Sequence, residues 1–108
     1  MKCITVLYPS KDNDAFDLDF YKRRHAPLVE DILGPTLHKI EVRSGTPGPD
    51  GTKPTYIAVI SIWISDWEGY EARMKVRAQE LIDEVPLFTK AMPLIQIDEV
   101  AYDSAAKG

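Results

Sequence analysis

The chain has 108 residues, enough for one domain with a single small core and too few for two. Hydrophobic residues make up 44% and charged residues 28% of the chain, which excludes a wholly disordered protein. The net charge of -4 argues against nucleic-acid binding, because the basic residues of 22–24 and 73–77 are interleaved with acidic ones. We therefore expect one globular domain spanning residues 1–108.

The first part of the chain predicts a strand, a helix and a second strand. Residues 2–8 are rich in β-branched and aromatic side chains and precede Pro9, which is typical of a strand followed by a loop over residues 9–15. The second strand covers residues 37–44 and follows the helix-stop signal Gly34–Pro35.

The helix between these strands carries a titratable ring on its apolar face. At about 100° per residue this face holds Leu18, Tyr21, His25, Leu28, Val29 and Ile32. Asp17 is expected to cap the helix at its start. Pro27 has no N–H for the carbonyl of Arg23 and should kink the helix or divide it in two. His25 thus lies directly before a predicted break.

The second part predicts a hairpin, a helix and a last strand. Residues 45–54 are rich in glycine and proline and are expected to form a long loop before the strand at 56–64. Ser65 and Glu68 have the spacing of a capping box for the second helix, and Pro86 is expected to end it.

Residues 94–101 complete the pattern as the last strand. The order β-α-β-β-α-β predicts an α+β, ferredoxin-like subunit: an antiparallel sheet with two helices on one face. The polar residues 103–108 are expected to form a loosely attached tail.

The uncovered face of this sheet should be polar in a monomer. In the third strand, however, Tyr56, Ala58, Ile60 and Ile62 alternate with Ile57, Val59, Ser61 and Trp63. Exposing about four large side chains would forgo roughly 1.5 to 3 kcal/mol each. We therefore expect a symmetric homodimer in which two sheets pack face to face. The alternative is a monomer with scattered apolar surface.

His25 and Tyr21 are the candidate catalytic residues. A neutral imidazole can accept or donate a proton near physiological pH, and the Tyr21 hydroxyl could donate a hydrogen bond to a carbonyl or phenolate oxygen. The residues also allow a structural role for His25, in which it caps a carbonyl freed by Pro27 or fills a semipolar gap beneath the helix.

Four aromatic residues are candidates for binding a small organic substrate: Tyr8, Tyr56, Trp63 and Phe88. We expect no metal site, because His25 and His38 have no closely spaced cysteine or acidic partner, and His38 should lie at the surface. The sequence has no nucleotide or flavin motif, so we expect no cofactor.

The location is expected to be cytoplasmic. The single cysteine, Cys3, cannot form an intrachain disulfide, suits a reducing compartment and should be a small core residue. The sequence opens without a secretion-signal pattern. Its longest apolar run, residues 56–64, is about half as long as a membrane-spanning helix requires, so we expect no membrane association.

The stretch FDLDFYKRRHAPLV at residues 16–29 resembles the signature of the EthD family, small members of the dimeric α+β barrel superfamily. The opening VLYP and the closing DEVPLFTKAMPLIQIDEV are also similar, so the resemblance covers nearly the whole chain. The signature histidine corresponds to His25, and an aromatic position corresponds to Tyr21. Phe20 departs from the pattern, which often has a second tyrosine there, and one possible hydroxyl is thereby lost.

The resemblance implies a sheet-to-sheet homodimer that forms a dimeric α+β barrel, with a cavity between helices and sheet for a small, often apolar compound. It is compatible with two functions, between which fold kinship does not choose. The first is a cofactor-independent oxidoreductase (oxygenase), lyase (decarboxylase) or isomerase, in which His25 assists proton transfer during small-molecule catabolism. The second is a non-catalytic ligand-binding or assembly module.

Overall fold

The structure is a computed structural model that describes residues 1–11 and 16–106. In chain order its elements are β1 (Lys2–Pro9), α1 (Leu18–Phe20), the π-helix η1 (Tyr21–His25), α2 (Ala26–Leu33), the short η2 (Gly34–Thr36), β2 (Leu37–Ser44), β3 (Tyr56–Ile64), α3 (Trp67–Phe88), β4 (Leu94–Glu99) and η3 (Ser104–Ala106). The predicted loop over residues 9–15 and the tail over 103–108 lie partly outside the described residues.

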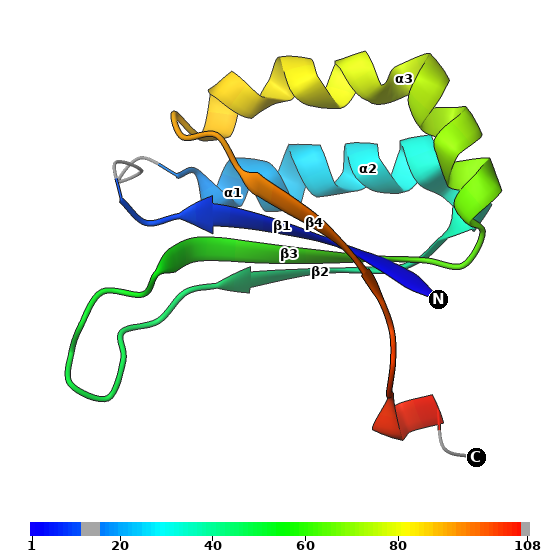
Figure 1. Cartoon of the computed structure of the whole chain (residues 1–108). Coiled ribbons are helices and arrows are strands. Elements are labelled where there is room, and N and C mark those ends of the chain that lie inside the picture. The colour runs from blue at the N-terminus through cyan, green and yellow to red at the C-terminus, as the bar shows by residue number, and fades with distance from the viewer. Residues whose placement is uncertain (12–15, 107–108) are drawn as a thin grey trace.

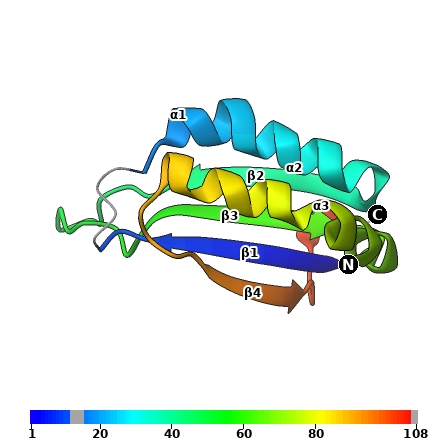
Figure 2. The same cartoon turned by 90° about the horizontal axis from the view of Figure 1, so that it is seen from above.

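The four strands form one antiparallel sheet in the order β2-β3-β1-β4, and the helices lie on one face of it (Figure 1). This arrangement confirms the predicted α+β, ferredoxin-like subunit. Figure 2 shows β4 at the edge of the sheet, beside α3 rather than beneath it. Ile95 and Ile97 of β4 are accordingly 64% and 54% exposed, although their strand neighbours in β1 are buried.

The core lies between the helices and the inner face of the central strands. Val6 of β1 is paired with Ile60 of β3, and Ile4 is paired with Ile62, so these side chains point toward the same face. The largest of the most deeply buried side chains are Tyr21, Ile32, Leu33, Ile60, Ile64 and Phe88. The apolar face that the 3.6-residue period gives the helices thus packs against the apolar face that the two-residue period gives the strands.

The outer face of the sheet is covered by none of α1, α2 and α3, and we call it the open face; the short η3 lies on this side (Figure 1). Its centre is mostly apolar and consists of Cys3, Thr5 and Leu7 of β1 with Val59, Ser61 and Trp63 of β3. Strand β2 adds charge along one side, where Arg43 donates hydrogen bonds to Glu41 at 2.6 Å and to Ser61 at 3.1 Å. Cys3 is buried, as expected, although it faces away from the helices.

Two predictions about helix starts had different outcomes. Asp17 does cap the first helix, because its carboxylate accepts a hydrogen bond from the N–H of Phe20 at 2.9 Å. The capping box at Ser65 was wrong, since Asp66 caps α3 and accepts from the N–H of Gly69 at 3.0 Å. The Ser65 hydroxyl instead donates to the carbonyl of Thr36 at 3.1 Å and ties α3 to the end of the first helical segment.

The prediction that Pro86 ends the second helix was also wrong, because α3 continues to Phe88. A proline inside a helix removes one hydrogen bond, here to the carbonyl of Ile82. Ile82 and Pro86 are both exposed, so water can reach the freed carbonyl on the outer side of the helix. The last strand is also shorter than predicted: β4 ends at Glu99, two residues before the predicted end.

Replacing Ile32 with alanine should lower the free energy of unfolding by about 2 to 5 kcal/mol, because the residue is 1% exposed and its removal leaves a cavity. Urea denaturation at a fixed protein concentration measures the change. Ile82→Ala is the matched control, since Ile82 is 58% exposed, and it should cost less than about 1 kcal/mol. Equal losses in the two variants would contradict this assignment of the core.

Candidate functional site

His25 lies in a cluster of aromatic rings between the helices and the sheet. The centroid of its imidazole is 4.9 Å from that of Tyr21 and 4.8 Å from that of Phe88, and the residue is 5% exposed. Tyr8 reaches the cluster from β1, with its ring edge-on to Tyr21 at 6.2 Å and to Phe88 at 5.9 Å. The fold therefore brings together four of the six predicted site residues.

Glu84 completes the site and was not among the residues predicted from the sequence. The Nδ1 atom of His25 is 2.9 Å from Oε1 of Glu84, which lies on α3 one turn before Phe88. In the described part of the chain Nδ1 is the ring nitrogen that has a hydrogen bond. The available signal was the spacing of Glu84 and Phe88, because residues four apart share one face of a helix.

The carboxylate of Glu84 selects the tautomer of the imidazole. An ionised carboxylate accepts hydrogen bonds but cannot donate them, so Nδ1 carries the proton and donates it to Glu84. Nε2 then holds the free lone pair. A histidine oriented by a carboxylate in this way is the arrangement that enzymes use for a general base.

Burial is the main influence on the charge of His25. It lowers the pKa of the imidazole from the ordinary 6.5, while the hydrogen bond and the negative charge of Glu84 raise it and offset part of this shift. The net shift is downward, so the ring is neutral at pH 7 and can accept a proton.

The two tyrosines of the cluster are suited to donating hydrogen bonds. Burial raises the pKa of Tyr8 to about 12. Burial raises the pKa of Tyr21 still further, and the nearby Tyr8 adds to that shift. Both phenols keep their protons at physiological pH, which excludes them as bases under those conditions and leaves them as donors toward an oxygen atom.

The other two predicted substrate-binding residues lie elsewhere. Trp63 is on the open face, on the opposite side of the sheet from His25, with Nζ of Lys39 4.9 Å from the centroid of its ring. Tyr56 begins β3 opposite Pro9 and lies outside the apolar core cluster. The structure does not bring these two to the His25 cluster, and a role for them in substrate binding stays a prediction.

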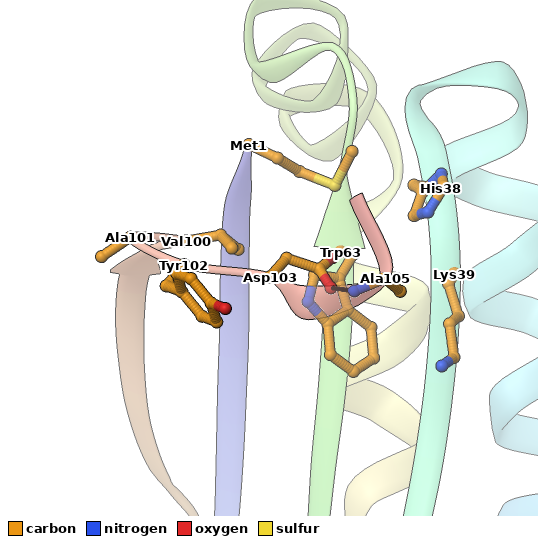
Figure 3. A pocket seen from close by; sticks show the side chains of 9 residues that line it. All are labelled: Met1, His38, Lys39, Trp63, Val100, Ala101, Tyr102, Asp103 and Ala105. Carbon is orange, nitrogen blue, oxygen red and sulfur yellow. Dashed lines mark hydrogen bonds between the residues drawn. The ribbon is translucent and has the colours of Figure 1, made fainter. Parts of the chain in front are cut away.

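Trp63 instead lines a hollow of about 860 Å³ between the open face and the C-terminal segment (Figure 3). The other lining residues are Met1, His38, Lys39, Val100, Ala101, Tyr102, Asp103 and Ala105. His38 is exposed on β2, as expected from the sequence. This hollow lies outside the His25 cluster, because the sheet separates the two.

The described residues, 1–11 and 16–106, contain neither a cluster of metal ligands nor a membrane-spanning helix. Within these ranges no group of three or more histidine, cysteine, aspartate or glutamate side chains could hold a metal ion. None of the helices described there combines the length and the apolar composition needed to span a membrane.

Replacing Glu84 with glutamine should lower the pKa of His25 further, because the variant removes the negative charge that favours the protonated ring. An NMR titration of the imidazole signals measures this shift directly. The exposed His38 supplies a second signal in the same sample, which should respond little to the substitution. A His25 pKa that stays unchanged or rises in Glu84→Gln would contradict the assigned pair.

The lowered pKa of His25 also predicts how stability depends on pH. Between the folded pKa and 6.5 the unfolded chain binds a proton at this residue and the native protein does not, so the free energy of unfolding rises with pH and then levels off. His25→Gln should reduce this slope, as measured by urea denaturation at pH values below and above 6.5. His38→Gln controls for the loss of an imidazole, and equal slopes in wild type and His25→Gln would argue against the assignment.

Comparison with known proteins gives structural relatives. No protein-family model matches the sequence, and no curated protein matches it. An EthD-like protein from Ralstonia eutropha JMP134 is 27% identical, with a TM-score of 0.87 over 94% of this chain and 93% of that one.

Two more distant structures share the fold. An ethyl tert-butyl ether D (EthD) family protein from Bacillus halodurans C-125 is 20% identical, with a TM-score of 0.69 over 92% of this chain and 97% of that one. HapK from Hahella chejuensis is 18% identical, with a TM-score of 0.59 over 98% and 99% of the two chains.

Proposed function

We propose that this chain is an EthD-like protein that binds a small apolar or oxygenated organic compound beside His25 and transfers a proton to or from it. The observation that carries the proposal is the 2.9 Å contact between Nδ1 of His25 and Oε1 of Glu84 within a buried aromatic cluster. A carboxylate that holds Nδ1–H leaves Nε2 as the proton acceptor. The site is proposed to work in the cytoplasm.

The neighbouring residues have distinct roles in this proposal. The neutral hydroxyl of Tyr21 donates a hydrogen bond to a carbonyl or phenolate oxygen and stabilises negative charge that develops there. The rings of Phe88 and Tyr8 contact the apolar part of the compound. Proton transfer at His25 is a step common to cofactor-independent isomerisation, decarboxylation and oxygenation, the reaction classes that the resemblance to the EthD family implies.

A second candidate function is a non-catalytic ligand-binding or assembly module. The close packing of Tyr21 and Phe88 on the imidazole, at 4.9 and 4.8 Å, favours this alternative. In that case the pair of His25 and Glu84 is a structural link between the first helical segment and α3.

Hydrogen exchange into a bound compound distinguishes the two functions. Phenols and aryl ketones are first screened for binding by NMR, and those that shift the His25 signals are then followed in D2O for exchange of their carbon-bound hydrogens. The wild type should catalyse exchange, and His25→Gln should lose about 100-fold or more of the rate. His38→Gln should keep the wild-type rate. Binding with equal exchange in wild type and His25→Gln would favour the non-catalytic module.

We also propose that two copies of the chain pack through their open faces as a symmetric homodimer. The support is the apolar centre of that face, where Leu7, Val59 and Trp63 lie on the side of the sheet opposite α1, α2 and α3, and the charged rim on β2. An apolar patch of this kind on a soluble domain is commonly an interface.

A charge placed in the open face should separate the two copies. The wild type should be dimeric by sedimentation equilibrium at micromolar concentration. Val59→Arg puts a guanidinium at the centre of β3 and should make the protein monomeric under the same conditions. Val76→Arg is the matched control, because Val76 is 81% exposed on α3, and it should remain dimeric. A monomeric wild type would overturn the dimer.

A further inference from the structure

The helix that carries His25 contains one wide turn. The N–H of Ala26 donates to the carbonyl of Tyr21, five residues back, where an α-helix would use the residue four back. Pro27 follows at once and lies in the first turn of α2, where its missing N–H is tolerated. The sequence predicted a kink or a division at this proline, and the structure forms a π-helical division.

The wide turn decides where the Tyr21 side chain points. In an uninterrupted α-helix, at about 100° per residue, Tyr21 would lie about 90° from the centre of the buried face of α2. That face consists of Ala26, Val29, Ile32 and Leu33. Accommodating one extra residue unwinds the helix by roughly 100°, which returns Tyr21 to within about 10° of that centre.

The burial of the preceding residues agrees with this geometry. Tyr21 is 2% exposed, whereas Leu18 and Phe20, which precede it in α1, are only partly buried. The rotation turns the Tyr21 ring toward the sheet, where it lies edge-on to Tyr8 at 6.2 Å and to Phe88 at 5.1 Å. The contact with His25, four residues along, is one that a regular helix also allows. Such a helix would nonetheless carry Tyr21 toward the edge of the buried face and away from the centre of the cluster.

We propose that Pro27 is a positioning residue: it holds η1 in the π form and thereby keeps the Tyr21 ring turned toward Tyr8 and the sheet, beside the His25 imidazole. This inference rests on the roles proposed above for Tyr21 and His25. In an α-turn the ring of Pro27 would press against the carbonyl of Arg23, which the wider turn avoids. With alanine at position 27 the N–H returns, and the intrinsically favoured α-turn becomes accessible.

The test compares Pro27→Ala with Pro35→Ala, which changes an exposed proline in η2. Nuclear Overhauser contacts between the Tyr21 and Tyr8 rings are measured without any ligand, together with far-UV circular dichroism to establish folding. Pro27→Ala should lose these contacts and expose Tyr21 to a soluble paramagnetic probe, while Pro35→Ala should retain the wild-type pattern. Contacts that persist unchanged in Pro27→Ala would overturn the inference, since packing alone would then hold the turn.

A second variant keeps the inference testable if Pro27→Ala folds poorly. Deleting the exposed Arg23 in the Pro27→Ala background removes the extra residue, so a regular α-helix would again place Tyr21 on the buried face. This variant should fold and recover the contact between the two rings. A deletion variant that folds without the contact would overturn the inference.

The ligand-free readout separates this inference from the proposed function. If the wild type transfers no proton but Pro27→Ala loses the ring contact, the positioning role stands and the proposed function fails. If the contact is unchanged in Pro27→Ala while wild type and His25→Gln differ in exchange rate, the proposed function stands and the positioning role fails.

Discussion

A polar ring buried beneath a helix needs a hydrogen-bond partner, and His25 has one 59 residues further along the chain on α3. An unsatisfied buried nitrogen would cost about 1 to 3 kcal/mol, so the two helical segments are constrained to meet at this contact. Because α3 continues past Pro86, Glu84 and Phe88 present a carboxylate and a ring to the same imidazole. The site therefore depends on where two helices cross as much as on the residues of either one.

Local signals in the sequence predicted much of the fold. The alternation of residues 56–64, the polar residue at Asp17 and the helical period around His25 each depend on a few neighbours, and each gave the correct element. The start and end of α3 were harder to predict. Ser65 and Asp66 are both good capping residues one position apart, and the tertiary bond from Ser65 to Thr36 decided between them. Pro86 was tolerated because its lost hydrogen bond faces solvent.

The site itself was half predictable. The helical period placed Tyr21 and His25 together, but the acidic partner came from α3, and a sequence pattern cannot specify how two helices cross. A strand sends neighbouring side chains to opposite faces, so the one-residue step from Ile62 to Trp63 separates the core from the open face. Counting aromatic residues could not make this distinction. The π-turn is similar, because Pro27 predicted a break but not that the helix would continue with one residue more per turn.

The hydrogen bond to Glu84 holds the proton on Nδ1 of His25 and leaves Nε2 as the acceptor. Long-range ¹H–¹⁵N NMR correlations of the imidazole distinguish the two tautomers and the cationic ring in the ligand-free protein. At neutral pH we expect a neutral ring protonated on Nδ1. A ring protonated on Nε2, or on both nitrogens, would contradict this assignment.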